Sequence, residues 1–79
     1  MPKLVPIKPK RLIKILLSLE FTKRDAEGSH VFFAHPDGRT TVIPLHNRDI
    51  SRGLLRKILN DIQLSVDEYE KLRTKNTNH

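Results

Sequence analysis

Apolar residues recur at helical spacing in the first part of the chain. At about 100° per residue around a helical wheel, five leucines and isoleucines fall on one broad face. These residues are Leu12, Ile13, Leu16, Leu17 and Leu19. Because proline is favoured in the first turn of a helix, we predict a helix that begins near Pro9 and packs this face into a core.

A second run of apolar residues has the same spacing later in the chain. It comprises Leu54, Leu55, Ile58, Leu59 and Ile62. Either Asp49 or Ser51 can cap this second helix, because both side chains accept hydrogen bonds from backbone N–H groups. Ser65 is followed three residues later by Glu68, which is the pattern of a capping box and predicts a short last helix through about Arg73.

The middle of the chain favours strands over helices. Residues 29–34 are rich in β-branched and aromatic side chains and predict a central strand. Residues 35–38, with the sequence His-Pro-Asp-Gly, predict a tight turn into a second strand over residues 40–43. Residues 21–25 predict an edge strand, which a turn at residues 27–28 joins to the central strand. The three strands therefore form an antiparallel meander.

The order of these elements defines an α+β fold. One helix, three strands and two helices give a two-layer sandwich, in which the helices cover one face of a three-stranded antiparallel sheet. The 79 residues are close to the lower size limit of a single core, so we expect one domain over residues 1–79. Residues 1–7 contain two prolines and predict an extended arm, and residues 74–79 predict a frayed polar tail.

Composition excludes several classes of protein. The chain has no cysteine, so it forms neither a disulfide nor a thiolate metal site. Its apolar runs are far shorter than the roughly 20 residues that span a membrane. The first residues also lack the pattern of a secretory signal. We therefore expect a cytoplasmic protein that has no membrane association.

Charge narrows the expected partners. Fifteen Lys and Arg residues against nine Asp and Glu residues give a net charge of +6, and a small basic domain attracts polyanions, chiefly nucleic acid. Seven of the basic residues precede residue 25: Lys3, Lys8, Lys10, Arg11, Lys14, Lys23 and Arg24. Lys10, Arg11 and Lys14 lie opposite the apolar face of the first predicted helix. This basic stripe is either ordinary solvent-facing charge or a surface that faces phosphate.

Among the histidines, His30 is the best candidate for chemistry. Strand alternation places His30 and Phe32 on the sheet face away from the helices, if Val31 and Phe33 face the core. Histidine titrates near neutral pH and can move protons, but a lone histidine on a strand is also an ordinary surface residue. Spacing alone leaves both alternatives open, and it supports neither a metal site nor a nucleophilic pair with Ser29.

Four segments resemble the HicA toxin family. They are GSHVF at residues 28–32, HPDGR at residues 35–39, VIPLH at residues 42–46 and LLRKIL at residues 54–59. The helix that leads into Phe21 is similar too, and the resemblance covers about residues 8–69. Each motif alone is weak, but the Gly-Ser-His element followed at this distance by the Pro-Leu-His element is quite specific.

The resemblance implies a fold and an activity. The fold would be that of a double-stranded-RNA-binding domain, αβββα, with an extra C-terminal helix. The activity would be that of an endoribonuclease toxin, which cuts messenger RNA, halts translation and depends on the histidine of the Gly-Ser-His motif, here His30. The partner would be a HicB-type antitoxin, which forms a hetero-oligomer with a toxin that is monomeric when free.

We expect His30 to act as general base on the RNA 2′-hydroxyl or as general acid on the leaving 5′-oxygen, without a metal or another cofactor. The expected RNA-binding residues are Lys10, Arg11, Lys14, Lys23, Arg24, Ser29, Phe32 and Arg39. Gly28 is expected to be a structural turn residue. His46 matches the family pattern, and either loop closure or substrate contact could be its role.

Three other functions compete with this hypothesis. A non-catalytic RNA-binding module would keep the basic stripe and Phe32 but would not need His30. A DNA-binding regulator would use the helix over residues 54–62, but the segment from residue 58 onward is acidic, which is the wrong sign for a DNA groove. A structural adaptor would bind only protein and would have no affinity for RNA.

Overall fold

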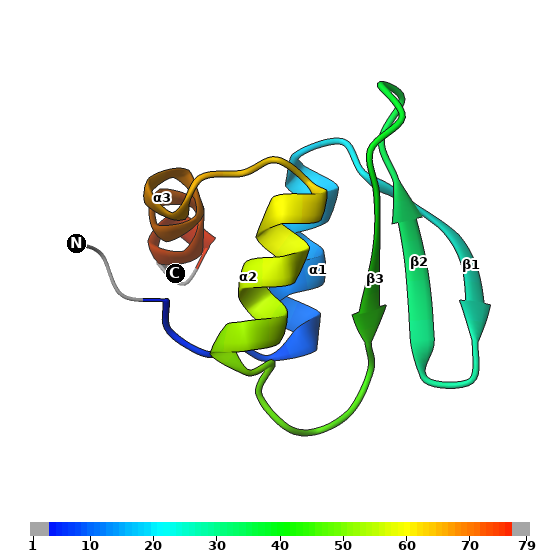
Figure 1. Cartoon of the computed structure of the whole chain (residues 1–79), viewed down its shortest axis with the longest axis horizontal. Coiled ribbons are helices and arrows are strands. Elements are labelled where there is room, and N and C mark those ends of the chain that lie inside the picture. The colour runs from blue at the N-terminus through cyan, green and yellow to red at the C-terminus, as the bar shows by residue number, and fades with distance from the viewer. Residues whose placement is uncertain (1–3, 77–79) are drawn as a thin grey trace.

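The computed structural model describes residues 4–76, which form the predicted α+β fold in the order αβββαα (Figure 1). The elements are α1 (Pro9–Ser18), β1 (Thr22–Glu27), β2 (His30–Ala34), β3 (Thr40–Pro44), α2 (Arg52–Asp61) and α3 (Val66–Asn76). The fold is consistent with that of double-stranded-RNA-binding domains, as the resemblance implied. Residues 1–3 of the predicted arm and residues 77–79 of the predicted tail lie outside the described residues.

The sheet is the antiparallel meander that the sequence predicts, with β2 between β1 and β3. Val31 and Phe33 of β2 are buried, whereas His30 is exposed and Phe32 is half-buried. Because successive side chains of a strand point to opposite faces, this pattern confirms that His30 and Phe32 share the face away from the helices. We call this face the open face of the sheet.

The first hairpin differs in its boundaries from the prediction. Phe21 precedes β1 and is buried in the core, and β1 continues to Glu27, where it pairs with His30. The turn consists of Gly28 and Ser29, so Ser29 lies outside β2. Cross-strand pairing with β2 decides these boundaries, and residue-by-residue propensity could not show where that pairing ends.

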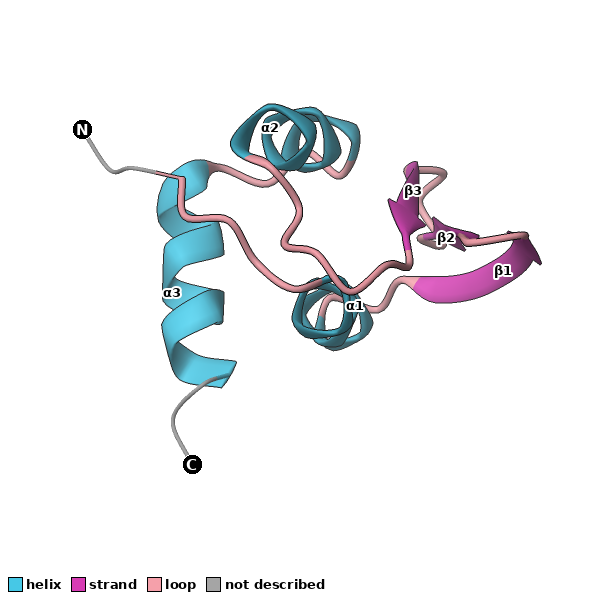
Figure 2. Cartoon of the chain, turned by 90° about the horizontal axis from the view of Figure 1, so that it is seen from below, coloured by secondary structure: helices cyan, strands magenta, loops and turns pink. Residues whose placement is uncertain are grey.

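The helices form two layers on one side of the sheet (Figure 2). α1 and α2 pack beside β3, and α3 packs against α1 on the side away from the sheet. Ser51 caps α2 by accepting a hydrogen bond from the N–H of Leu54, and Ser65 caps α3 through the N–H of Glu68. Both serines occupy the cap positions that the sequence suggested.

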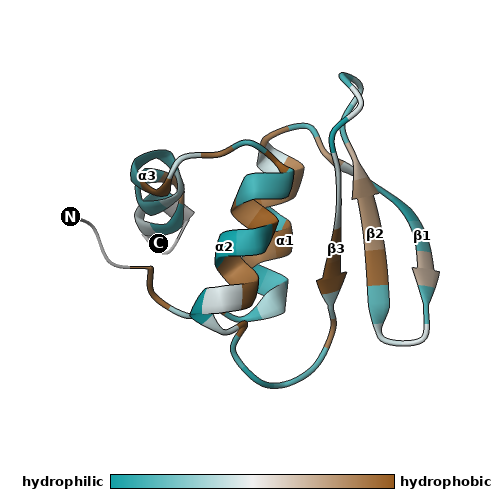
Figure 3. Ribbon diagram, viewed as in Figure 1, coloured by the Kyte–Doolittle hydropathy of each residue, from teal (hydrophilic) through white to brown (hydrophobic). Residues whose placement is uncertain are grey.

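The buried face of α1 is narrower than predicted. Leu12, Ile15 and Leu16 are buried, but Leu17 is 52% exposed. Leu17 therefore lies outside the core, because its position on the helical wheel is too far from the direction of these three residues. On α2, apolar and hydrophilic positions alternate around the helix (Figure 3), and Leu55, Ile58 and Leu59 are buried.

The N-terminal end of the described chain takes part in the core. Leu4 and Ile7 are buried, and the N–H of Ile50 donates to the carbonyl of Ile7 at 2.7 Å. α3 continues past Arg73 to Asn76, so the predicted end of the last helix was too early. Arg73 stabilises this last turn, because a cation near a helix C-terminus interacts favourably with the helix dipole.

Tyr69 joins α3 to the N-terminal segment and offers a test of this packing. Its hydroxyl lies 3.4 Å from the carbonyl oxygen of Val5, and burial raises the pKa of Tyr69 to about 12. An unfolded tyrosine ionises near pH 10. The folded protein therefore holds the neutral phenol where the unfolded chain has lost its proton, and stability should fall as the pH rises above about 10.

Because Tyr69 is the one tyrosine of the chain, tyrosinate absorbance measures its ionisation directly. We expect a midpoint well above 10 in native buffer and near 10 in denaturant. Tyr69→Phe should weaken the alkaline loss of stability. A native midpoint equal to the denatured one would show that the phenol is solvated.

Candidate functional site

His30 is the first residue of β2 and lies at one end of the open face. Its side chain is exposed and makes no hydrogen bond or ion pair within residues 4–76. Glu27 of β1 and Pro44 of β3 are its neighbours across the sheet. Both imidazole nitrogens are therefore open to a ligand that approaches this face.

The turn before His30 fixes where the imidazole stands. Gly28 has φ +60°, a left-handed conformation that glycine adopts without steric cost. The carbonyl of Ser29 accepts a hydrogen bond from the N–H of Leu45 and so extends the pairing of β2 with β3 beyond the strands. Gly28 thus has the turn role that the sequence suggests, and Ser29 is exposed beside His30.

The open face beside His30 carries carboxylates that the sequence analysis did not include. Glu27 faces His30 across the sheet, and Asp25 faces Phe32. The register shift between Lys23 and Asp25 contributes to this arrangement, because it changes which β1 residues stand opposite β2. The sequence could have shown that Glu27 and Asp25 lie beside His30 and Phe32 only if the register of β1 had been predicted. That register depends on the position of the turn.

The structure does not bring the β1 cations beside His30. Lys23 pairs with Phe33, three residues along β2 from His30, which corresponds to about 10 Å at the usual rise of a strand. Arg24 lies at the register shift next to Lys23. Both residues are exposed. They lie toward the end of the β1–β2 pair that is opposite His30.

Arg39 lies at the opposite end of the sheet and is engaged in packing. Its Nε donates to Asp37 Oδ2 at 2.8 Å, its Nη1 donates to the carbonyl of Ile62, and its guanidinium lies 5.2 Å from the centroid of the Phe21 ring. Hydrogen bonds from Arg39 lower the pKa of Asp37 below its usual value. These contacts fasten the β2–β3 turn to the end of α2, far from His30.

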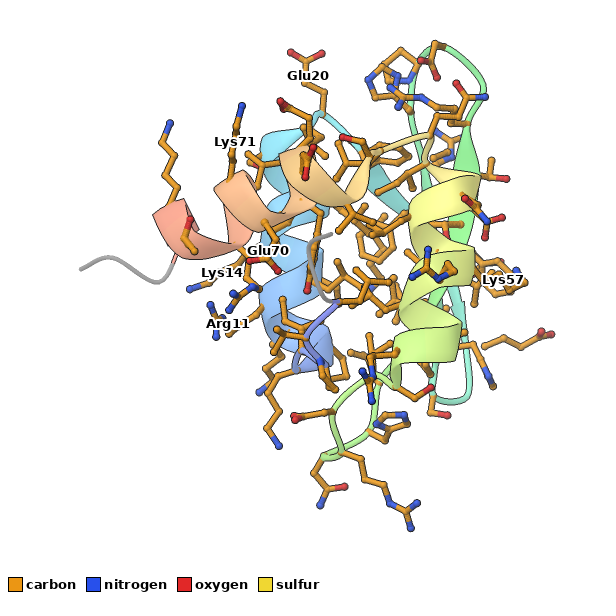
Figure 4. All side chains as sticks on the ribbon, turned by 60° about the vertical axis from the view of Figure 1, so that its left-hand side comes forward. Arg11, Lys14, Glu20, Lys57, Glu70 and Lys71 are labelled. Atoms are coloured by element: carbon orange, nitrogen blue, oxygen red, sulfur yellow. The ribbon has the colours of Figure 1, made fainter. Side chains whose placement is uncertain are left out.

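The predicted basic stripe on α1 contains two exposed lysines and one arginine that is hydrogen-bonded within the fold. Lys10 and Lys14 are exposed, whereas Arg11 is half-buried and its Nη2 donates to the carbonyl of Arg73 at 3.4 Å. Figure 4 shows Arg11 and Lys14 together on α1, beside Glu70 of α3. Arg73 pairs with Glu70 at 2.8 Å, and the hydrogen bonds that its guanidinium donates to the Glu70 carboxylate raise the pKa of Arg73.

His46 lies in the loop after β3, next to the start of α1. Its Nδ1 is 3.0 Å from the carbonyl oxygen of Arg48 and 3.3 Å from the backbone nitrogen of Arg48, which fixes the ring within the loop. The side chain also lines a groove with Pro9, Lys10 and Asn47. The sequence left loop closure and ligand contact as alternative roles for His46. The structure allows His46 to have both roles.

No group of three or more His, Asp or Glu side chains within residues 4–76 could hold a metal ion. Within the same residues, no helix is both long and apolar enough to cross a membrane.

The fold and the site define a small basic α+β domain that presents a histidine on the open face of its sheet. Residues 9–64 match the family model described as HicA toxin of bacterial toxin–antitoxin systems. The chain belongs to this family, because the match covers well over half of its 79 residues. The search of curated proteins found no match to the chain.

The conformation of Gly28 gives a test of the turn that presents His30. A Cβ at this position would meet no heavy atom within 4 Å, so the cost of Gly28→Ala comes from the left-handed backbone alone. We expect a loss of about 1 kcal/mol of unfolding free energy, measured by urea denaturation. Gly28→Asn should lose less, because asparagine tolerates this conformation. Equal stability of all three proteins would contradict the turn geometry.

Proposed function

We propose that this protein is a toxin that cleaves RNA and that His30 is its catalytic residue. The observation that carries the proposal is the imidazole at the start of β2, which is exposed on the open face and has no partner within residues 4–76. Membership of the HicA toxin family supports the toxin role. The net charge of +6 supports a polyanionic substrate.

The chemistry requires little from the protein, because RNA carries its own nucleophile. The 2′-oxygen attacks the adjacent phosphorus and the bond from phosphorus to the 5′-oxygen breaks. His30 either takes the proton of the 2′-hydroxyl or gives a proton to the leaving 5′-oxygen, and water exchanges the other proton. A positioned group of this kind typically contributes about 10²–10⁴-fold to the rate. The products are a 2′,3′-cyclic phosphate and a free 5′-hydroxyl. Glu27, across the sheet from His30, can accept a hydrogen bond from the imidazole and orient it.

Phe32 and the exposed cations supply binding. Phe32 is half-buried on the same face as His30, two residues along β2, where its ring can stack on an unpaired base. Lys10, Lys14 and Ser29 are exposed and can contact the RNA backbone. Lys23 and Arg24 extend the basic surface along β1, whereas the contacts of Arg39 within the fold argue for a structural role.

Substitution of His30 tests catalysis directly. We expect native protein to cut a labelled single-stranded RNA in excess EDTA and to leave 2′,3′-cyclic phosphate ends. His30→Ala should reduce the rate by about 10²-fold or more without weakening RNA binding. The matched control is Thr40→Ala, at an exposed position of β3 near the other end of the sheet. Gel analysis of the products and anisotropy of a labelled RNA separate cutting from binding.

The competing function is a non-catalytic RNA-binding module of the same fold. It is favoured by the exposed Lys10 and Lys14 and the half-buried Phe32, which can bind RNA without any role for His30. Equal RNA binding by native protein and His30→Ala, with no cutting by either, would establish this function instead. Cutting that stops in EDTA would contradict the metal-free mechanism.

We further propose that the antitoxin of this system is a HicB-type protein that covers His30 and the start of α1. A basic site is complementary to an acidic partner, which speeds association and fixes orientation. We expect the affinity of the complex to fall with increasing salt, and RNA cleavage to stop when the antitoxin is present. Calorimetry across a salt series measures the first effect. A salt-insensitive complex that leaves cleavage intact would contradict this arrangement.

A further inference from the structure

A shallow groove runs between the start of α1 and the loop over residues 45–47. It consists of two adjoining hollows of about 300 and 390 Å³. The larger is lined by Lys8, Pro9, Lys10, Arg11, His46 and Asn47. Volumes in this range are typical of sites that hold a small molecule or one residue of a longer ligand.

The lining of the larger hollow is cationic and contains no carboxylate. Lys10 is exposed and has no hydrogen bond or ion pair within residues 4–76. Lys8 is held at the rim, because its Nζ lies 3.1 Å from the carbonyl oxygen of Asn47 and 3.4 Å from Asp49 Oδ1. Arg11 is fixed by the carbonyl of Arg73. One free cation thus stands beside two whose positions are set by the fold.

His46 adds an oriented ring to these cations. Its Nδ1 faces the backbone of Arg48, where it either donates to the Arg48 carbonyl at 3.0 Å or accepts from the Arg48 N–H at 3.3 Å. Nε2 has no partner within the described part of the chain. In the protonated ring, Nε2–H is a charged donor, and such a donor makes a short, strong hydrogen bond to phosphate oxygen.

The groove and His30 lie at the same end of the sheet. The turn before His30 is joined to the loop by the hydrogen bond from the N–H of Leu45 to the carbonyl of Ser29, and His30 pairs with Pro44. The β1–β2 turn, the loop after β3 and the start of α1 all lie at the lower end of the molecule in Figure 1. A polynucleotide that passes His30 can therefore continue into the groove.

We propose that this groove is a phosphate-binding subsite for an RNA strand, in which Lys10 and His46 are the ligands of a backbone phosphate. The subsite rests on the proposed function for its ligand, an RNA whose scissile bond lies at His30. Lys8 and Arg11 flank the phosphate and add to the local positive potential. The groove would thus position the strand, while His30 moves the proton.

The test measures RNA binding in a protein that does not cut. In the His30→Ala background, each variant is titrated into a fluorescein-labelled single-stranded RNA over a salt series. Lys10→Gln and His46→Gln should each raise Kd several-fold at low salt, and together about tenfold. Loss of one phosphate contact should also reduce the salt slope by about 0.7. The control is Arg56→Gln, which removes one exposed positive charge from α2.

The outcomes separate the subsite from the proposed function. Equal effects of Lys10→Gln and Arg56→Gln would show that net charge alone matters and would overturn the subsite. Native RNA affinity with lost antitoxin affinity would make the groove a protein-binding surface instead. If native protein does not cut RNA but the groove variants still weaken binding, the cleavage proposal fails and the subsite stands. Circular dichroism of each variant checks that the fold is intact.

Discussion

Anchoring of the central strand in the core is the constraint on which the rest of the site depends. Val31 and Phe33 are buried in the core that also contains residues of α1 and α2, and the alternation of a strand then places His30 and Phe32 on the opposite face. A slip of one residue would bury the imidazole and expose both apolar side chains, so the hydrophobic effect that stabilises the sheet also fixes its register. The position of His30 is therefore a consequence of packing, and needs no dedicated partner.

Three segments that are far apart in the sequence meet at the His30 end of the sheet. The Ser29–Leu45 hydrogen bond joins the first turn to the loop after β3, and the Ile7–Ile50 bridge joins that loop to the segment before α1. Both bonds use backbone groups, so they constrain position without restricting the exposed side chains. This arrangement holds the loop that lines the basic groove close to the His30 end of the sheet.

Some of the basic side chains are used within the fold, and others are exposed. The guanidinium groups of three arginines donate within the domain: that of Arg11 to a carbonyl, that of Arg73 to a carboxylate, and that of Arg39 to both. Lys10 and Lys14 remain exposed on α1. The count of fifteen Lys and Arg residues therefore overstates the number of cations that are free to bind RNA.

The sequence by itself determined the order of the elements, the cap at Ser65 and the outward direction of His30 and Phe32, because these follow from local periodicity and side-chain chemistry. It left Asp49 and Ser51 as alternatives for the cap of α2, and the structure decided for Ser51. Only the tertiary structure decided which residues surround His30. The register of β1 places Glu27 beside it, and packing of remote segments builds the groove around His46. Packing between elements also leaves Leu17 exposed and brings Arg39 to the end of α2, where it donates a hydrogen bond to the carbonyl of Ile62. Contacts between residues distant in sequence depend on how whole elements pack, and no local pattern records them.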